Sequence, residues 1–225
     1  MRKSKNIVAT IKEWNLDNYR RYCSDDNFSL IKKNSDLKLE EIKALNPDYI
    51  FFPHWSWLIP KEIWSKYDCV VFHMTELPYG RGGSPLQNLI LRGKTRTKIS
   101  AFKVNGGLDT GDIYCQRPLS LAGSAEEIYK RASEIIFKMM IPYIIKNRPK
   151  PEKQRGKAVR FNRRNPFQSK INDNLNVKEL YDFIRMLDAP GYPKAFLETE
   201  KLRMEFFRAN FKNHKLSANV NIYAK

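Results

Sequence analysis

Short apolar runs alternate with amphipathic stretches along the first part of the chain. Residues 6–10 (NIVAT), 48–52 (DYIFF) and 69–73 (CVVFH) are rich in β-branched and aromatic residues, which predicts three buried strands. Apolar positions at helical spacing predict helices over 35–45, opened by Ser35 or Asp36, and over 60–67. This alternation of strand and helix is typical of an α/β fold with a mainly parallel sheet flanked by helices.

The pattern continues and then changes near residue 150. Further elements are expected in the order helix from Ser84-Pro85 to before Gly93, strand 97–104, long helix 124–146 kinked or ended by Pro142, helix 176–187 and strand 202–206. Residues 147–164 are polar and basic, which indicates an ordered connector. We therefore predict a catalytic domain over 1–150 and a short C-terminal α+β extension over 151–225.

Composition places the chain among folded proteins without membrane spans. Of its 225 residues, 42% are hydrophobic, and none of the apolar runs approaches the roughly 20 residues that cross a bilayer. The N-terminus has no apolar segment of signal-peptide type, so a cytoplasmic location is expected. The three cysteines and three histidines show no metal-ligand spacing, so neither a disulfide framework nor a metal site is expected.

The charge of the chain is strongly positive. Its 41 Lys and Arg residues exceed its 24 Asp and Glu residues and give a formal net charge of +17. Such a field suits nucleic acid, an anionic membrane surface or a phosphorylated small molecule, and it also fits a solvated Lys-rich surface. Specific nucleic-acid binding is not expected, because the sequence has no zinc finger, RNP pattern or basic zipper helix.

Three predicted strands end in loops that are rich in polar, aromatic and glycine residues. These loops are PHWSWLIP over 53–60, HMTELPYGRGGSP over 73–85 and NGGLDTGD over 105–112. Ligands of open α/β sheets bind outside the carboxyl ends of the strands, so the three loops outline one predicted site. The chain has no GxGxxG fingerprint, which argues against a standard dinucleotide site.

Two residues of these loops could carry out chemistry. His73 ends an apolar strand, where an imidazole can donate a proton or stabilise charge; a hydrogen-bonded core histidine is the alternative. Asp109 lies in a glycine-rich turn, where an aspartate often bonds only to nearby backbone. Each residue taken alone leaves both interpretations open.

The joint pattern of the three loops resembles a known family. His73-x-x-x-Leu77-Pro78 followed by Arg81-Gly82, then Leu108-Asp109-Thr110-Gly111-Asp112, is similar to the signatures of folate-dependent formyltransferases, over roughly residues 46–136. The resemblance implies a formyltransferase-type Rossmann-like fold, N10-formyltetrahydrofolate as formyl donor, no metal, and His73 and Asp109 as catalytic residues. His73 would stabilise the formyl oxygen, and Asp109 would orient His73 and take the proton of the attacking amine.

The resemblance also implies binding residues for both substrates. The segment resembling the family's pterin loop supplies His54, Trp55, Trp57, Leu58 and Ile59, which with Asp109 are the candidates for folate binding. The candidates for binding the acceptor are Thr75, Arg81, Gly82, Gly83, Ser84, Asn105, Arg163 and Arg164. Core packing for the two tryptophans, and loop bracing for Arg81, are the structural alternatives.

One position departs from the family pattern. The family places an asparagine two residues before the histidine, and this chain has Val71 there, on the strand face that His73 shares. That amide helps to hold the formyl oxygen in the family. A backbone N–H, Asn105 or His54 could replace it, and the sequence does not choose among them.

The acceptor is predicted from the remaining segments. Only about 75 residues follow the catalytic part, which argues against transfer RNA, and RRNPFQS and the tail resemble bacterial nucleotide-sugar N-formyltransferases. We therefore expect a dTDP- or UDP-linked amino-dideoxy sugar, such as UDP-4-amino-4,6-dideoxy-N-acetyl-altrosamine of the pseudaminic-acid pathway, and a place in cell-surface polysaccharide biosynthesis. The alternatives are a basic RNA-binding module, a methionyl-tRNA-type formyltransferase relative and a folate-dependent hydrolase. A homo-oligomer is expected because symmetric dimers are common.

Overall fold

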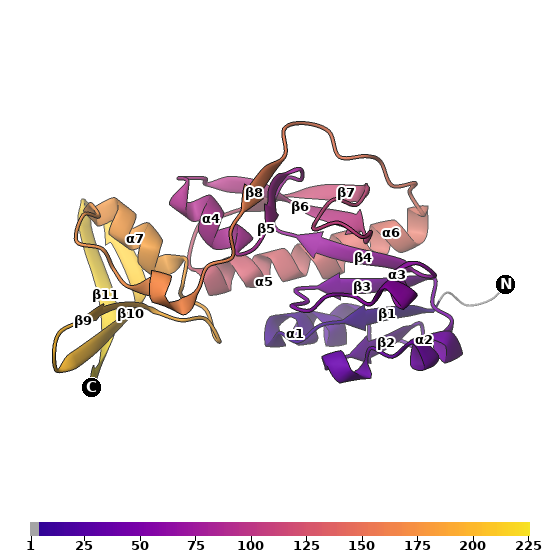
Figure 1. The fold of residues 1–225 in the computed structure, drawn as a ribbon, viewed down its shortest axis with the longest axis horizontal. Helices are drawn as coiled ribbons and strands as arrows, with labels where there is room; N and C mark the ends of the chain where they lie inside the picture. The colour runs from indigo at the N-terminus through magenta and orange to yellow at the C-terminus, as the bar shows by residue number, and fades with distance from the viewer. Residues whose placement is uncertain (1–4) are drawn as a thin grey trace. The chain divides into compact units, whose positions relative to one another are not determined.

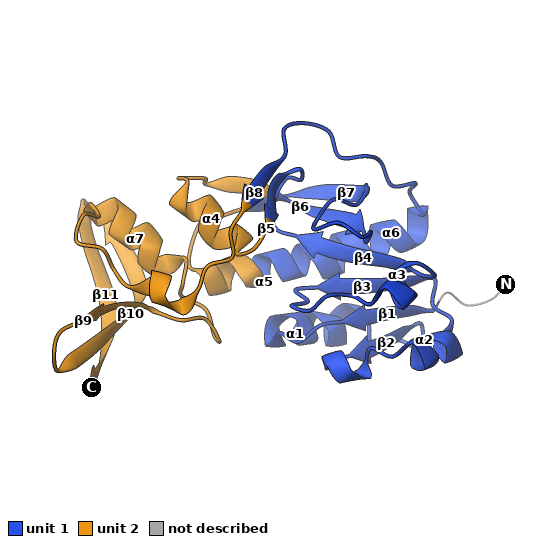
Figure 2. Cartoon of the chain, viewed as in Figure 1, with its two compact units in different colours: residues 1–81, 98–119, 130–160 blue, residues 82–97, 120–129, 161–225 orange. Residues whose placement is uncertain are grey.

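A computed structural model describes residues 5–225, which form two compact units (Figures 1 and 2). Of the described residues, unit 1 consists of 5–81, 98–119 and 130–160, and unit 2 consists of 82–97, 120–129 and 161–225. Each unit gathers segments that are distant in the sequence. The predicted domains 1–150 and 151–225 are continuous stretches of sequence, whereas each compact unit combines separate segments. The predicted domain division therefore stays a prediction.

A six-stranded sheet, which lies mostly in unit 1, carries the fold. Its order is β2 (Phe28–Ile31), β1 (Asn6–Ala9), β3 (Tyr49–Pro53), β4 (Asp68–His73), β6 (Arg96–Lys103) and β7 (Ile113–Ser120). The first four strands are parallel, and β6 is antiparallel to β4. The predicted α/β fold with a mainly parallel sheet is therefore confirmed.

The central strands of this sheet carry apolar residues on both faces, so both faces must be covered by other elements. One face carries a core cluster in which Ile42 of α2 (Leu39–Leu45) and Ile63 of α3 (Lys61–Trp64) pack against Ile7, Ile50 and Phe52. The helical segments α1 (Glu13–Tyr22), η2 (Ile136–Met140) and α6 (Ile141–Asn147) complete the helical part of unit 1, while α5 (Ala125–Ile135) belongs to unit 2 up to Tyr129 and to unit 1 from Lys130. Figure 1 shows α6 behind the sheet.

The long helix predicted over 124–146 is interrupted, as its proline suggests. Residues Ile136–Met140 form a π-helical segment, and α6 starts at Ile141 with Pro142 in its first turn. The Ile141 N–H still donates to the carbonyl of Ile136, a π-helical bond, whereas Pro142 has no N–H to donate, so the regular α-helical ladder is broken next to the proline. The expected effect of Pro142 is therefore observed.

Unit 2 contains a helical part and an antiparallel sheet. Its elements are α4 (Pro85–Leu91), η3 (Pro166–Ser169), α7 (Val177–Arg185), β9 (Ala195–Glu198), β10 (Leu202–Lys212) and β11 (Lys215–Ala224). Strand β10 pairs with β9 and β11. Helix α7 begins with a capping box in which Asn176 and Glu179 each accept a hydrogen bond from the other's backbone N–H. The predicted C-terminal α+β extension is thus confirmed.

Several elements differ from the prediction. The sequence did not indicate α1, β2, β7, β9, β11 or the small sheet of β5 (Tyr79–Gly82) and β8 (Val159–Phe161). The helix expected from residue 35 begins at Leu39, after a short 3-10 turn η1 (Asn34–Asp36). Ser84 does not cap α4: its backbone is left-handed with φ 48°, and its hydroxyl accepts a bond from the Arg164 N–H instead.

Among residues 5–225, no helix is long and apolar enough to cross a membrane. The cysteines Cys23, Cys69 and Cys115 are all buried and unbonded.

Candidate active site

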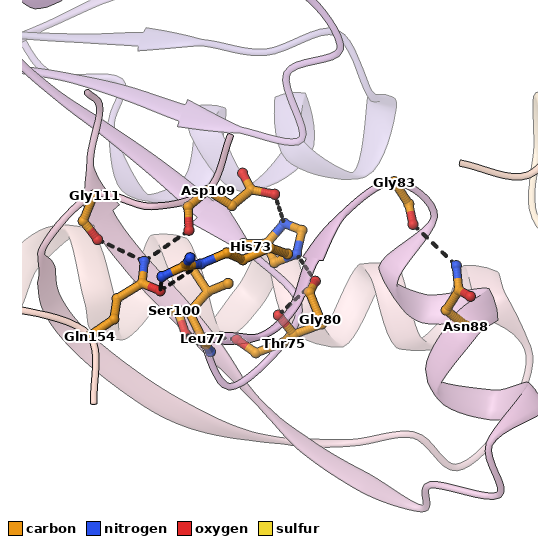
Figure 3. A network of polar contacts seen from close by, with 11 residues as sticks. His73, Thr75, Leu77, Gly80, Gly83, Asn88, Ser100, Asp109, Gly111 and Gln154 are labelled. Carbon is orange, nitrogen blue, oxygen red and sulfur yellow. Dashed lines mark hydrogen bonds and ion pairs between the residues drawn. The ribbon is translucent and has the colours of Figure 1, made fainter. Parts of the chain in front are cut away.

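The carboxyl end of β4 places His73 next to two loops. His73 is 8% exposed, and its register partner in β6 is Ser100. Its Nε2 lies 2.8 Å from the carbonyl oxygen of Gly80, and its Nδ1 lies 3.7 Å from Oδ2 of Asp109 (Figure 3). Because a carbonyl oxygen only accepts, Nε2 carries a hydrogen, and a proton on Nδ1 would make an ion pair with Asp109. The two residues predicted as catalytic therefore meet.

The loop of Asp109 is a tight turn closed at its base by backbone. The N–H of Lys103 donates to the carbonyl of Asp112 at 2.8 Å, and a Cβ at Gly111 would overlap the carbonyl oxygen of Lys103. Asp109 itself has φ 52°, a left-handed conformation that aspartate adopts more readily than most residues. The glycine-rich sequence of this loop is thus explained by close backbone approach.

Asn105 braces this turn from inside. Its Oδ1 accepts hydrogen bonds from the N–H of Gly107 at 3.0 Å and from the hydroxyl of Thr110 at 2.8 Å. The Asn105 side chain is exposed, and its Nδ2 makes no hydrogen bond to the residues that the structure describes. One half of the amide is therefore structural, while the other half can reach a ligand.

Thr75 and Arg81, both predicted to bind the acceptor, hold the loop after His73. The hydroxyl of Thr75, a fully buried residue, donates to the carbonyl of Gly80 at 3.3 Å. The guanidinium of Arg81 donates through Nε and Nη2 to Oε1 of Gln154, at 3.1 and 2.7 Å. Both side chains thus brace the Gly80 segment in this structure.

Gln154 is a site residue that sequence reasoning missed. Its Nε2 donates to the carbonyls of Asp109 and Gly111 at 2.9 and 2.8 Å, so its amide joins the Asp109 turn to Arg81 (Figure 3). Gln154 belongs to the connector before β8, where a single glutamine among lysines and prolines gave no signal. The position of the connector is set by paired backbone bonds between Glu152 and Ile113.

The predicted folate loop divides into anchored and exposed side chains. Trp55 and Ile59 pack against the core cluster of unit 1, with the Trp55 ring 5.9 Å from that of Phe52. Trp57 is 44% exposed and Leu58 is 89% exposed. Core packing therefore accounts for Trp55 and Ile59, which anchor the loop. It does not account for Trp57 and Leu58, which form an exposed apolar surface.

His54 has a structural environment. It has φ 55° and its ring meets Trp14 edge-on at a centroid distance of 5.6 Å. Removal of water around the imidazole, helped by the nearby charge of Lys12, lowers the pKa of His54 to about 3. His54 is therefore neutral near pH 7.

Five of the predicted acceptor residues lie in unit 2: Gly82, Gly83, Ser84, Arg163 and Arg164. Gly82 has φ 108°, and Gly83 donates its N–H to the carbonyl of Phe161 at 3.1 Å. Side chains at these two positions would overlap Phe161 and Arg163, so both glycines permit close contact with the strand β8 and the residues after it.

Arg163 and Arg164 of unit 2 differ in their surroundings. Arg163 is exposed, whereas the guanidinium of Arg164 bonds to the carbonyl of Gln168 and lies 5.7 Å from the Phe183 ring. Burial lowers the pKa of Arg164 below its ordinary value. Asn88, which the sequence did not indicate, donates to the carbonyls of Gly83, Ser84 and Asn162 and holds this loop.

The chain matches two protein-family models. Residues 15–144 match a model described as formyl transferase, and residues 166–223 match one described as methionyl-tRNA formyltransferase, C-terminal domain. The formyl transferase family uses N10-formyltetrahydrofolate as the formyl donor. Residues 5–225 contain no group of three or more His, Cys, Asp or Glu side chains that could hold a metal ion.

Relatives and solved structures agree with these models. A methionyl-tRNA formyltransferase from Ehrlichia ruminantium is 30% identical over 178 residues, which cover 76% of this chain and 57% of that protein. A structure titled methionyl-tRNA formyltransferase from Clostridium thermocellum matches with a TM-score of 0.96 and 52% identity, over 99% of this chain and 100% of that chain. HypX from Aquifex aeolicus, crystallised in complex with tetrahydrofolic acid, shares the fold with a TM-score of 0.75 and 16% identity, over 92% of this chain and 38% of that chain.

The predicted nucleotide-sugar acceptor is wrong. A 4-N formyltransferase from Francisella tularensis matches with a TM-score of 0.66 and 17% identity, over 88% of this chain and 94% of that chain, which shows the fold alone. The tail, whose shortness argued against transfer RNA, itself matches the C-terminal domain model of methionyl-tRNA formyltransferase. The short length of the tail therefore did not exclude a match to this type of C-terminal domain.

The depressed pKa of His54 makes the stability of the protein depend on pH. Because the unfolded imidazole takes up a proton below about pH 6.5 and the folded one only near pH 3, stability is full above pH 6.5 and decreases as the pH falls. In the wild type, His54 should lower the free energy of unfolding by about 2 kcal/mol between pH 7 and pH 5. We expect this decrease to be absent in His54→Asn. Urea denaturation at both pH values measures it.

His214→Asn is the matched control for this prediction. His214 also has positive φ, at 59°, but is exposed in the turn between β10 and β11, so its replacement should leave the pH dependence as in the wild type. An unchanged pH dependence in His54→Asn would contradict the assignment.

Proposed function

Because the chain belongs to the formyl transferase family, we propose that it transfers the formyl group of N10-formyltetrahydrofolate to the amino group of methionyl-tRNA. The observation that carries the acceptor is the 52% identity, over 99% of this chain, with a structure titled methionyl-tRNA formyltransferase. The match of the tail to the C-terminal domain model supports it. The net charge of +17 also suits an RNA polyanion. A cytoplasmic location fits this acceptor and stays a prediction.

The reaction requires one proton to leave the attacking nitrogen. The amine forms a bond to the formyl carbon, the bond between that carbon and N10 of the donor breaks, and N10 gains a proton. We assign Asp109 to accept the amine proton, which general-base catalysis makes worth about 100-fold or more. Its carboxylate is 14% exposed, so water competes little for it.

We assign His73 to stabilise the negative charge that grows on the formyl oxygen. Its Nε2 donates to the carbonyl of Gly80 and its Nδ1 faces the carboxylate of Asp109, so these two contacts fix the orientation of the ring. A hydrogen-bond donor or dipole that is already held in place acts without reorganisation and can lower the barrier by several kcal/mol.

The loop around Trp55 and Trp57 is our candidate for holding the donor. Exposed Trp57 and Leu58 can lie against a flat apolar ring, and the two indoles are 5.0 Å apart, edge to face. The Nε1–H of Trp55 is buried and makes no hydrogen bond to the described residues. A polar edge of the donor would satisfy this N–H, which supports the fit.

The acceptor is tested by supplying the wild-type chain with N10-formyltetrahydrofolate and either methionyl-tRNA, uncharged tRNA or free methionine. We expect formylmethionine, identified by mass spectrometry after deacylation, from methionyl-tRNA alone. The KM for methionyl-tRNA should rise on the order of 10-fold or more between about 50 and 200 mM salt, because bound phosphates release counterions. Formate release without an acceptor would indicate a hydrolase, and RNA binding without turnover would indicate an RNA-binding module; either result contradicts the proposal.

Asp109→Asn tests the proposed base. Asparagine also adopts positive φ, so the turn should persist, while kcat should fall about 100-fold or more because an amide does not accept the proton. Single-turnover transfer rates measure the loss. Asp112→Asn in the same turn is the control, since only its backbone closes the turn, and it should keep kcat within about 3-fold. Equal rates in Asp109→Asn and wild type would remove the assignment.

Asn105→Asp tests which group replaces the family asparagine at Val71. We propose the Nδ2 of Asn105, because His54 is neutral and packs edge-on against the Trp14 ring, while this amide is exposed in the Asp109 turn. The variant keeps oxygens for the bonds to Gly107 and Thr110 but removes the donor, so kcat should fall about 10- to 100-fold. Steady-state kinetics measure it, with Asn213→Asp in unit 2 as the control; a kcat equal to wild type would leave this role to a backbone N–H.

A further inference from the structure

The side chain of Gln154 uses its full hydrogen-bonding capacity within unit 1. Its Oε1 accepts two bonds from the guanidinium of Arg81, and its Nε2 donates to the carbonyls of Asp109 and Gly111. An amide has two N–H donors and two acceptor lone pairs, so none is left for solvent or a ligand. Gln154 therefore joins two loops and does not itself face a substrate.

These bonds complete a ring around His73. Gly80 accepts from Nε2 of His73, its neighbour Arg81 is held by Gln154, and Gln154 holds the backbone of Asp109, whose carboxylate faces Nδ1 of His73 (Figure 3). Both contacts of the imidazole thus depend on segments that Gln154 ties together. A change at Gln154 should alter the separation of carboxylate and imidazole.

The Asp109 turn needs such a tie. Asp109 has positive φ, at 52°, in a segment with no regular secondary structure, and such a conformation persists only where its surroundings impose it. Two hydrogen bonds to the carbonyls on either side of Thr110 resist its relaxation. The connector that bears Gln154 is itself held by the backbone pair of Glu152 and Ile113.

We propose that Gln154 is a positioning residue for formyl transfer, which acts by setting the geometry of the Asp109 carboxylate against His73. This inference rests on the proposed function for its kinetic consequence. It requires an amide at position 154, because one end of the side chain must accept from a guanidinium while the other donates to two carbonyls. A carboxylate would keep the first half and oppose the second.

Gln154→Glu separates these halves. We expect kcat for formyl transfer to methionyl-tRNA to fall about 10- to 100-fold, because small displacements of reacting groups are costly, while KM for the folate donor changes less than about 3-fold. Gln154→Met, which removes both halves without adding charge, should lower kcat at least as much. Thermal unfolding followed by circular dichroism shows whether each variant is folded.

Lys153→Gln is the matched control for charge. Lys153 is exposed next to Gln154, and its replacement changes the net charge by the same single unit as Gln154→Glu. It should keep the kcat of the wild type. A loss of kcat in Lys153→Gln equal to that in Gln154→Glu would assign the effect to charge and overturn the proposal.

A measurement that needs no turnover distinguishes this inference from the proposed function. The chain has three histidines, so the ring nitrogen signals of His73 can be assigned in nitrogen-15 NMR spectra by comparison with His54→Asn and His214→Asn. The His73 ring shifts should change in Gln154→Glu and Gln154→Met and stay constant in Lys153→Gln. Unchanged shifts in folded Gln154 variants overturn the inference, whether or not the wild type formylates methionyl-tRNA.

Discussion

The hydrogen bond between Nε2 of His73 and the carbonyl of Gly80 decides what the rest of the site can do. A carbonyl oxygen can only accept, so the bond assigns a hydrogen to Nε2 and turns Nδ1 toward Asp109. The sheet provides this arrangement: β4 ends at His73, and antiparallel β6 brings Ser100 beside it, whose hydroxyl bonds to the Thr75 carbonyl at 2.7 Å. The hydrogen bond from Ser100 to Thr75 therefore holds the loop that carries Gly80 close to the end of β4.

The site replaces a neutral hydrogen-bond donor by an apolar side chain. Val71 packs against the core cluster of unit 1, together with Trp55, Trp64 and Val104. Val71 shares a strand face with His73, and its apolar side chain cannot donate a hydrogen bond there. The hydrogen bond that the resemblance assigns to an asparagine at this position must therefore come from another group, for which we propose Asn105.

The reactive pair could be predicted from the sequence because its two members follow local rules. His73 ends an apolar strand, and Asp109 lies in a turn whose glycines indicate that backbone segments approach each other closely. Gln154 could not be predicted, because its role depends on where a connector without regular structure passes, 45 residues from Asp109. Strands such as β11, whose residues are mostly exposed, lack the apolar pattern by which buried strands are predicted. The sequence therefore predicted residues whose role depends on their neighbours in the chain. It did not predict residues whose role depends on hydrogen bonds between distant loops.

The acceptor was mispredicted because length was given more weight than charge. The tail is an ordered part of unit 2: α7 packs on β10, and the Tyr181 and Phe211 rings lie 5.8 Å apart. A short segment can therefore be a specific module. Charge alone could not discriminate among ligands, but within a formyl transferase it does. A small amine needs few cationic partners, whereas an RNA polyanion gains from every positive charge within about a Debye length of its phosphates. A net charge of +17 on 225 residues therefore agrees with the proposed RNA acceptor.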